Sequence, residues 1–233
     1  MIEWKHLTSG EIPALDHRLP VIIPVGLIEA HGPHLALSVD ADTADYFSRR
    51  IAEATGAILA PVLPYGFADE MVDYPGTIGL TLDTAISVFT DLAANFCRHG
   101  FKRIIFLSGH GANQTAFSTA IHRIWQQYPD ARLVYWNYWS EAGFNNIAHA
   151  DQGETEIAMA VGTRACMEKV QDFKVKKPWY RIRSRAEICP GTGGINGEPS
   201  KASSAKGKQV CDEIVRVLAE KVRTIINAEK TAP

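Results

Sequence analysis

Four side chains of the kinds that bind metal ions lie close together near the start of the chain. Glu29, His31, His34 and Asp40 occur within one twelve-residue segment, directly after an apolar run at 19–26. Burying two carboxylates and two imidazoles this close together is costly unless something cationic neutralises them. A divalent metal ion does so directly, because carboxylate oxygens and imidazole nitrogens are common metal ligands. The segment therefore predicts a metal site at the end of a buried strand.

Two later segments carry side chains of the same kinds. A glycine-rich turn at 108–113 contains His110, and His149 precedes Glu154 by five residues further along. Taken alone, each has a simpler explanation, since His110 could merely cap the helix that follows its turn. All three segments, however, follow an expected strand, and α/β folds place their chemistry at the carboxyl ends of parallel strands. We therefore expect the three segments to form one site.

The elements that must bring these segments together alternate along the chain. Apolar runs of strand length are followed by stretches with the apolar period of a helix. Strands are expected at 19–26, 57–63, 103–107 and 131–138, and helices at 41–55, 81–99, 113–128 and 154–166. Strands separated by helices of this length form βαβ units, and hence a mainly parallel sheet covered on both faces. The expected fold class is α/β, a three-layer α/β/α arrangement that forms a single domain over residues 1–233.

Composition argues against several classes of partner. The chain has 24 Lys and Arg residues against 26 Asp and Glu residues, so its net charge of -2 gives no signal for nucleic acid or an anionic membrane. A small molecule is the expected partner. The start of the chain lacks a basic region followed by an apolar core, and no apolar stretch is long enough to cross a bilayer. The four cysteines form no Cys-x-x-Cys pair, and we expect a protein of the reducing cytoplasm.

One basic and one glycine-rich stretch have plain interpretations. Lysines and arginines recur over 174–185 beside Trp179 and Tyr180, and we interpret this run as a solvated strand or an interface hairpin rather than as a nucleic-acid site. Residues 191–194 are rich in glycine but lack the Lys-Ser or Lys-Thr of a phosphate-binding loop. They are expected to form a flexible loop that closes over the active site.

The ordered motifs resemble those of a known family. From about residue 2 to about residue 220, the chain looks like the creatininase family of metal-dependent amidohydrolases. The motifs that carry the resemblance are Glu29-x-His31-Gly-Pro-His34 with Asp40, Tyr74-Pro-Gly-Thr77, Ser108-Gly-His110-Gly-x-Asn113, and His149 with Glu154-Thr155. A later segment, 193–199, resembles the family's Gly-x-Gly-Asp-Pro stretch. The resemblance also implies a homo-oligomer, often a hexamer.

The resemblance implies a centre with two divalent metal ions per subunit. Glu29 and His110 would hold one ion, and His31 and Glu154 the other. Asp40 would bridge the two ions through its two carboxylate oxygens. Zinc is the expected metal, with manganese and iron as alternatives, because imidazole and carboxylate ligands suit all three. Such a pair of ions presents hydroxide to a carbonyl that one of them also polarises.

Two further histidines are expected to act without belonging to the ligand set. His149 matches the family histidine that protonates the leaving nitrogen, and a surface-loop histidine is the simpler alternative. His34 also matches the family motif. We expect it to support the turn beside the ligands, with direct ligation as the alternative.

The chain departs from the creatinine-hydrolysing members at one ligand position. Those members carry a glutamate ligand within the Gly-His turn, where this chain has Ala112. The missing ligand must come from elsewhere, and Glu154 is the natural supplier. This departure argues against a creatininase in the strict sense.

Several other residues are candidates for the substrate pocket. Asp69 and Glu70 stand where the family commonly has Ser or His, and two acidic groups there would favour a cationic or hydroxyl-rich substrate; solvated carboxylates or loop caps are the alternative. Asn113 is a candidate for the pocket or for support of the ligands. Trp139 is expected at a strand end, either stacked on a planar substrate or buried in the core or a subunit interface.

These residues together predict a metal-dependent hydrolase that acts on a non-peptide amide C–N bond, with a cyclic amide as one candidate. Within the family, the alternatives are a formamide on an opened nucleobase, a short peptide precursor and a ketonic sugar ring. A non-catalytic metal-binding scaffold is the alternative from another class, and the intact ligand set argues against it. A nucleotide-binding α/β module is a third option, but its glycine motif is missing.

Overall fold

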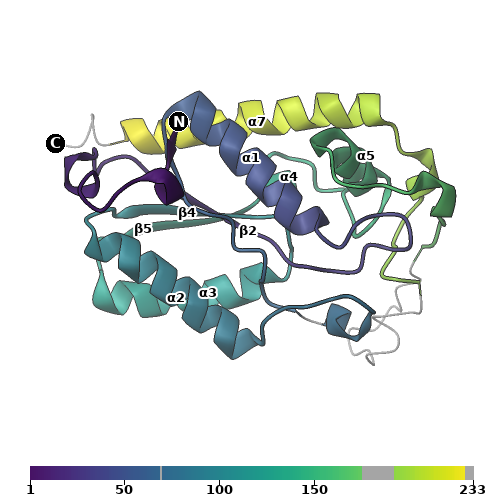
Figure 1. Cartoon of the computed structure of the whole chain (residues 1–233), viewed down its shortest axis with the longest axis horizontal. Helices are drawn as coiled ribbons and strands as arrows, with labels where there is room; N and C mark the ends of the chain where they lie inside the picture. Colours follow the sequence, from purple (N-terminus) through teal and green to yellow (C-terminus); the bar gives the residue numbers. More distant parts are fainter. Residues whose placement is uncertain (69, 175–191, 229–233) are drawn as a thin grey trace.

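A parallel β-sheet forms the centre of the molecule (Figure 1). The computed structural model describes residues 1–68, 70–174 and 192–228. Within these residues the sheet has the strand order β1-β3-β2-β4-β5, and every pair of neighbours is parallel. The strands are β1 (Ile2–Glu3), β2 (Val21–Val25), β3 (Ile58–Leu59), β4 (Arg103–Ser108) and β5 (Arg132–Asn137).

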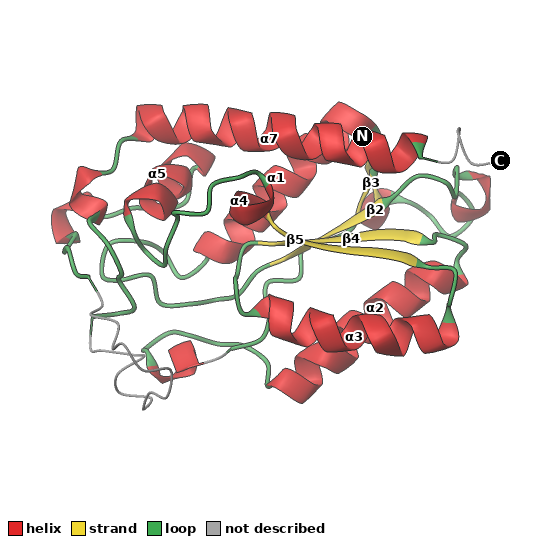
Figure 2. Cartoon of the chain, turned by 180° about the vertical axis from the view of Figure 1, so that it is seen from behind, coloured by secondary structure: helices red, strands yellow, loops and turns green. Residues whose placement is uncertain are grey.

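Helices cover both faces of this sheet (Figures 1 and 2). On one face lie α2 (Leu82–Arg98) and α3 (Asn113–Gln127), and on the other lie α1 (Val39–Thr55), α4 (Tyr138–Glu141), α5 (Gln152–Val161) and α7 (Ser204–Asn227). Short 3-10 helices occur at Trp4–His6, Ile12–Ala14, Glu70–Asp73, Met167–Lys169 and Pro199–Lys201. The expected three-layer α/β/α arrangement is therefore confirmed.

The core has two halves, one on each face of the sheet. Because successive side chains of a strand point to opposite faces, Ile104 and Phe106 of β4 pack toward α2 and α3, whereas Ile105 and Leu107 pack toward α1 and α7. The central strands β2 and β4 are buried along their whole length. Burial on both faces explains why these strands have continuous apolar sequences rather than alternating ones.

Several boundaries differ from the sequence expectation by one to five residues. The strand expected at 57–63 shortens to Ile58–Leu59, and beyond it Pro61 has no N–H to donate to a neighbouring strand. Strand β5 ends at Asn137, and Trp139, expected at the end of that strand, belongs to helix α4. Helix α5 ends at Val161 rather than at 166. The short N-terminal strand β1 was not expected.

Helix α7 closes the face that carries α1 and α5. Its first turn is held by Glu156 of α5, a buried carboxylate that accepts a hydrogen bond from the Ser203 N–H at 3.3 Å and lies 3.5 Å from Lys206 Nζ. Anionic groups stabilise a helix N-terminus, so this carboxylate serves the packing of α5 on α7. Among the described residues, none of the helices has both the length and the apolar composition needed to cross a membrane.

Candidate metal centre

The candidate ligands meet where the carboxyl ends of β2 and β4 contact the start of α1. Backbone contact at this point is very close: a Cβ atom added to Gly109, which follows β4, would lie 2.1 Å from the Asp40 carbonyl oxygen. No side chain fits between the strand end and the helix. Because Gly109 has no side chain, Asp40, in the first turn of α1, lies directly over the edge of the sheet.

A first group of ligand atoms joins Glu29, Asp40 and His110. The Nδ1 atom of His110 lies 3.0 Å from Glu29 Oε2 and 3.4 Å from Asp40 Oδ2. The three side chains come from the loop after β2, from α1 and from the turn after β4, and all three are buried. They are close enough to share one cation.

A second group joins His31, Asp40 and Glu154. The Nε2 atom of His31 lies 3.2 Å from Asp40 Oδ1 and 3.5 Å from Glu154 Oε2. Asp40 thus belongs to both groups, with one carboxylate oxygen facing each histidine. Glu154 comes from α5, which explains how a residue far along the chain completes the second group.

The hydrogen bonding of these side chains indicates that a positive charge belongs between them. His31 Nδ1 lies 3.0 Å from the Glu29 carbonyl oxygen, which can only accept a hydrogen bond. In a neutral His31, the Nε2 lone pair then points at two carboxylates. Buried atoms of this cluster without a hydrogen-bond partner among the described residues include both Glu29 carboxylate oxygens, Asp40 Oδ2, His31 Nε2 and His110 Nε2. Orphaned donors and acceptors of these types, so close together, fit divalent metal ions.

The electrostatics of the protein without metal agree with this interpretation. Burial favours a lower pKa for His31, but Glu154 and Asp40 outweigh it and raise the pKa well above its usual range. His110 behaves in the same way, because Glu29 and Asp40 raise its pKa against the effect of burial. For Asp40, burial acts to raise the pKa, yet His31 and His110 lower it to about 2. The carboxylates thus require cations beside them, whether protons on the histidines or metal ions.

Hydroxyl groups fix the backbone that carries His110. The hydroxyl of Ser108 donates to the His110 carbonyl oxygen at 2.8 Å and accepts from the His110 N–H at 3.1 Å. Tyr135 of β5 donates to the same carbonyl oxygen at 3.3 Å. The Tyr135 contact leaves no local signal in the sequence, because Tyr135 and His110 are 25 positions apart.

The start of α5 is fixed in a similar way. Asp151 accepts hydrogen bonds from the Glu154 N–H and the Ala148 N–H, both at 2.9 Å, and so caps the helix. Between them, Ala150 has a φ of 48°, the only positive φ of a non-glycine residue within the described ranges. Its N–H donates to the Glu154 carboxylate. A strained residue whose N–H is bonded to the carboxylate of a candidate ligand is typical of a functional site.

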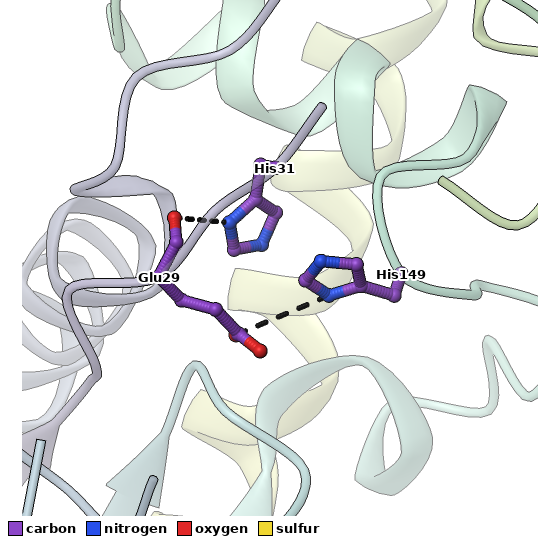
Figure 3. A group of neighbouring side chains, drawn as sticks. All are labelled: Glu29, His31 and His149. Atoms are coloured by element: carbon purple, nitrogen blue, oxygen red, sulfur yellow. Dashed lines mark hydrogen bonds and ion pairs between the residues drawn. The ribbon is translucent and has the colours of Figure 1, made fainter. Parts of the chain in front are cut away.

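His149 lies at the edge of the cluster, and its side chain is 25% exposed. Figure 3 shows Glu29, His31 and His149 gathered around one point. The Nε2 atom of His149 lies 2.8 Å from the Ala30 carbonyl oxygen, and its Nδ1 atom lies 3.9 Å from Glu29 Oε2. Its ring centroid is 4.2 Å from that of His31. Ala30 therefore engages one ring nitrogen, and the other faces the cluster.

The other candidate residues lie around this centre. His34 is buried, belongs to none of the ligand groups, and contacts the Thr155 hydroxyl of α5 through Nε2 at 3.0 Å. Burial is the main cause of its lowered pKa. Trp139 is half-buried, and its ring lies 3.9 Å from the position of a Cβ on Gly111, beside His110. The cluster thus has an aromatic side chain next to one candidate ligand, His110.

The side-chain amide of Asn113 makes hydrogen bonds within the protein through both its oxygen and its nitrogen. Its Oδ1 accepts from the Phe67 N–H at 2.8 Å, and its Nδ2 donates to the Gly26 carbonyl oxygen and the Ser108 hydroxyl at 3.3 and 3.2 Å. Asn113 therefore ties the loop after β3 to the ends of β2 and β4. Asp69 and the side chain of Glu70 lie outside the described residues, as does the basic run from 175 onward.

A parallel sheet with three carboxylates and two imidazoles buried at its carboxyl edge is an arrangement suited to a metal-dependent α/β hydrolase. The family model for creatininase, described as creatinine amidohydrolase, matches residues 5–222. The chain therefore belongs to the creatininase family, and it is a hydrolase of that family.

Relatives with different names match most of the chain. A mycofactocin precursor peptide peptidase of Mycolicibacterium smegmatis is 27% identical over 217 residues, which cover 87% of this chain and 84% of that protein. A creatinine amidohydrolase of Pseudomonas putida is 28% identical over 248 residues, and the match covers 95% of this chain and 94% of that protein. A 3-dehydro-scyllo-inosose hydrolase of Thermotoga maritima is 26% identical over 241 residues, and the match covers 88% of this chain and 77% of that protein.

Solved structures of creatininases share this fold. The crystal structure of a creatinine amidohydrolase superposes with a TM-score of 0.86 at 23% sequence identity and covers 100% of this chain and 99% of that one. A manganese form of creatininase has the same TM-score of 0.86 and the same 23% identity, and the match covers 100% of this chain and 99% of that one. A mutant creatininase of the Zn-Zn type also has a TM-score of 0.86 and 23% identity, and the match covers 99% of this chain and 98% of that one. The expected creatininase-like fold is thus confirmed.

Proposed function

We propose that this protein hydrolyses a non-peptide amide C–N bond and that it holds two divalent metal ions per subunit. Glu29 and His110 would hold one ion, and His31 and Glu154 the other, with Asp40 as the bridge. The observation that carries this proposal is the position of Asp40, whose two oxygens lie 3.2 Å and 3.4 Å from two different histidines. Zinc is the metal we propose, with manganese and iron as alternatives that the same ligands accept.

The metal ions would supply an activated water and a polarised scissile carbonyl. The protein's own contribution begins with proton transfer. Because Nε2 of His149 donates to the Ala30 carbonyl oxygen, the neutral ring carries its lone pair on Nδ1, which faces Glu29 and can accept a proton. We propose that His149 Nδ1 takes up a proton at the centre and delivers it to the leaving nitrogen. The partial exposure of His149 gives it access to the substrate side of the cluster.

The substrate is proposed to differ from creatinine. Ala112 offers no carboxylate to the turn beside His110, and Glu154 lies 3.5 Å from His31 in its place. The named relatives act on creatinine, a precursor peptide and an inosose, so substrates within the family differ widely. The alternatives are a formamide of an opened nucleobase, a short peptide precursor and a ketonic sugar ring. Trp139, beside His110, is the candidate to contact a planar group.

The proposed setting is a homo-oligomer, a hexamer by resemblance to the family, in the reducing cytoplasm. Support for the compartment comes from Cys97, Cys166 and Cys211, all of which are free thiols in the described part of the chain. The net charge of -2 supports a small-molecule partner rather than nucleic acid or an anionic membrane surface.

A histidine variant tests the proposal. Zinc-loaded protein and its His149→Ala variant would be compared on a panel of cyclic amides, N-formyl amides, short peptides and cyclic keto-polyols. We expect the variant to keep its metal and to lose roughly 10²- to 10⁴-fold in turnover, the usual contribution of a positioned acid or base. His122→Ala, a change at an exposed histidine of α3, is the control. Loss of metal in His149→Ala would make this residue a ligand instead, and unchanged turnover would remove it from the reaction.

A further inference from the structure

A segment near the end of the chain crosses directly over His149. Residues 193–196, here called the clamp segment, are joined by one hydrogen bond to the turn after His31 and by another to His149. The Gly32 N–H donates to the Gly193 carbonyl oxygen at 2.8 Å, and the Asn196 N–H donates to the His149 carbonyl oxygen at 3.0 Å. Ile195 of the same segment is fully buried. The clamp segment thus lies close to both histidines that flank the Glu29 carboxylate.

Three neighbours contact the partly exposed His149 imidazole. The ring of His31 lies against it, with planes inclined by 38°, and Ala30 accepts its Nε2–H. The backbone of Gly194 lies near the Cδ2–Nε2 edge of the ring, which is opposite Nδ1. A Cβ atom at this position would lie 2.8 Å from both Cδ2 and Nε2 of His149. Real Cβ atoms essentially never approach other atoms this closely.

The backbone at Gly194 offers no other space for a side chain. The same added Cβ atom would lie 2.4 Å from the methyl carbon of Met71. The φ of Gly194 is +85°, a left-handed conformation that favours glycine. Met71 could move its flexible end, whereas the ring of His149 could move only by breaking its 2.8 Å hydrogen bond to Ala30. A methyl group at 194 would therefore act mainly on His149.

We propose that Gly194 is a positioning residue for His149: its bare backbone holds the imidazole with Nε2 on Ala30 and Nδ1 toward the metal centre. This inference rests on the proposed role of His149 in proton transfer. Of the residues that could hold a metal ion, only His149 lies among these contacts, so Gly194 would act through the orientation of that ring. A displacement of about 1 Å at a catalytic group can reduce the rate about 10²-fold.

The first test measures the ring itself and requires no substrate. Zinc-loaded protein with ring-¹³C histidine would be compared with Gly194→Ala and Gly56→Ala, with the His149 signal assigned by its loss in His149→Ala. Gly56 is the matched control, since its φ is +77° and nothing lies within 4 Å of an added Cβ. We expect the Nε2–H tautomer signature of His149 in the parent and in Gly56→Ala, and a changed signature in Gly194→Ala with metal content retained. An unchanged His149 signal in Gly194→Ala would overturn the proposal.

The second test is a double-mutant cycle on the amide that the substrate panel identifies. Gly194→Ala should lower kcat about 10²-fold with little change in KM, and it should cause no further loss in a His149→Ala background. An equal loss in both backgrounds would show that Gly194 acts elsewhere. If Gly194→Ala does not fold, the double variant should fold again, because the clashing ring is gone; failure to do so would also contradict the clamp. If His149→Ala keeps full turnover, the proposed proton transfer fails, while the ring measurement still decides the role of Gly194.

Discussion

Among single residues, the hydroxyl of Ser108 has the clearest indirect effect on the proposed centre. It makes two hydrogen bonds with the backbone of His110 and accepts a third from Asn113. Ser108→Ala would leave the buried His110 N–H without this partner, at a cost of about 1–3 kcal/mol, and would leave the His110 carbonyl oxygen with only the Tyr135 hydroxyl. Loss of such support typically weakens metal binding about 10- to 100-fold.

We therefore expect Ser108→Ala to fold with reduced stability and to bind zinc about 10- to 100-fold more weakly, measured in competition with a chelating dye. Ser118→Ala is the control, because the Ser118 hydroxyl donates to a backbone carbonyl oxygen in the same way but is exposed on α3. Parent-like zinc affinity in Ser108→Ala would show that the His110 turn needs no such support.

Sequence could predict the candidate ligands at this scale because metal binding uses few residue types. Glu29, His31 and Asp40 are recognisable as a cluster within one segment from their residue types and spacing alone. Tyr135 carries no comparable signal, and Thr155 is recognisable only as part of a family motif, with no role attached to it. They act through hydroxyl contacts to residues 25 and 121 positions away, and many other serines, threonines and tyrosines have the same local sequence character without such contacts.

At the scale of elements, the decisive contact is the one between the end of β4 and the start of α1. Gly109 meets the backbone of Asp40, and neither backbone can move without displacing its strand or helix. Gly109→Ala places a methyl group 2.1 Å from the Asp40 carbonyl oxygen. We expect a loss of stability of about 1–3 kcal/mol or more from overpacking and a sharp loss of bound metal, because α1 carries Asp40 away from both histidines.

Denaturant unfolding and elemental analysis of Gly109→Ala would check this expectation. Gly10→Ala is the comparison, since nothing lies within 4 Å of an added Cβ there. If Gly109→Ala retained parent levels of metal and stability, the rigid contact between β4 and α1 would not be what positions Asp40.

Element type was predictable, whereas several boundaries were not. The long helices and the buried strands β2 and β4 follow from apolar periodicity and length. The end of β5 at Asn137 does not, because the aromatic residues of the run from Tyr135 to Trp139 favour a strand, yet Tyr138 and Trp139 belong to helix α4. Tyr138 is fully buried against Phe47 of α1, with ring centroids 4.4 Å apart. Tertiary packing of this kind overrides the local pattern.

At the scale of the whole molecule, binding of the proposed metal ions would add to the free energy of unfolding. The cluster joins the loop after β2, the turn after β4, α1 and α5, so a ligand bound there links elements from both halves of the chain. Metal present at 100 times its Kd adds about 2.7 kcal/mol to stability. For a chain of this length, that corresponds to roughly 5–10 °C in Tm.

We therefore expect chelator treatment to lower Tm by roughly 5–10 °C and added zinc to restore it, measured by calorimetry at fixed protein concentration. The chelated Asp40→Asn variant should show no zinc-dependent rise in Tm, because the residue shared by both ligand groups is lost. A parent protein whose Tm is indifferent to chelation and to zinc would have no tightly bound metal of the proposed kind.

The central claim is the pair of metal ions that share Asp40, and elemental analysis tests it most directly. Protein purified without added metal or chelator would be compared with Glu154→Gln and Asp40→Asn, with Asp45→Asn as the control because that carboxylate is partly exposed on the same helix. We predict close to two ions per subunit in the parent and the control, close to one in Glu154→Gln and none in Asp40→Asn. One ion or none in the parent, with no increase on adding zinc, would contradict the two-metal centre.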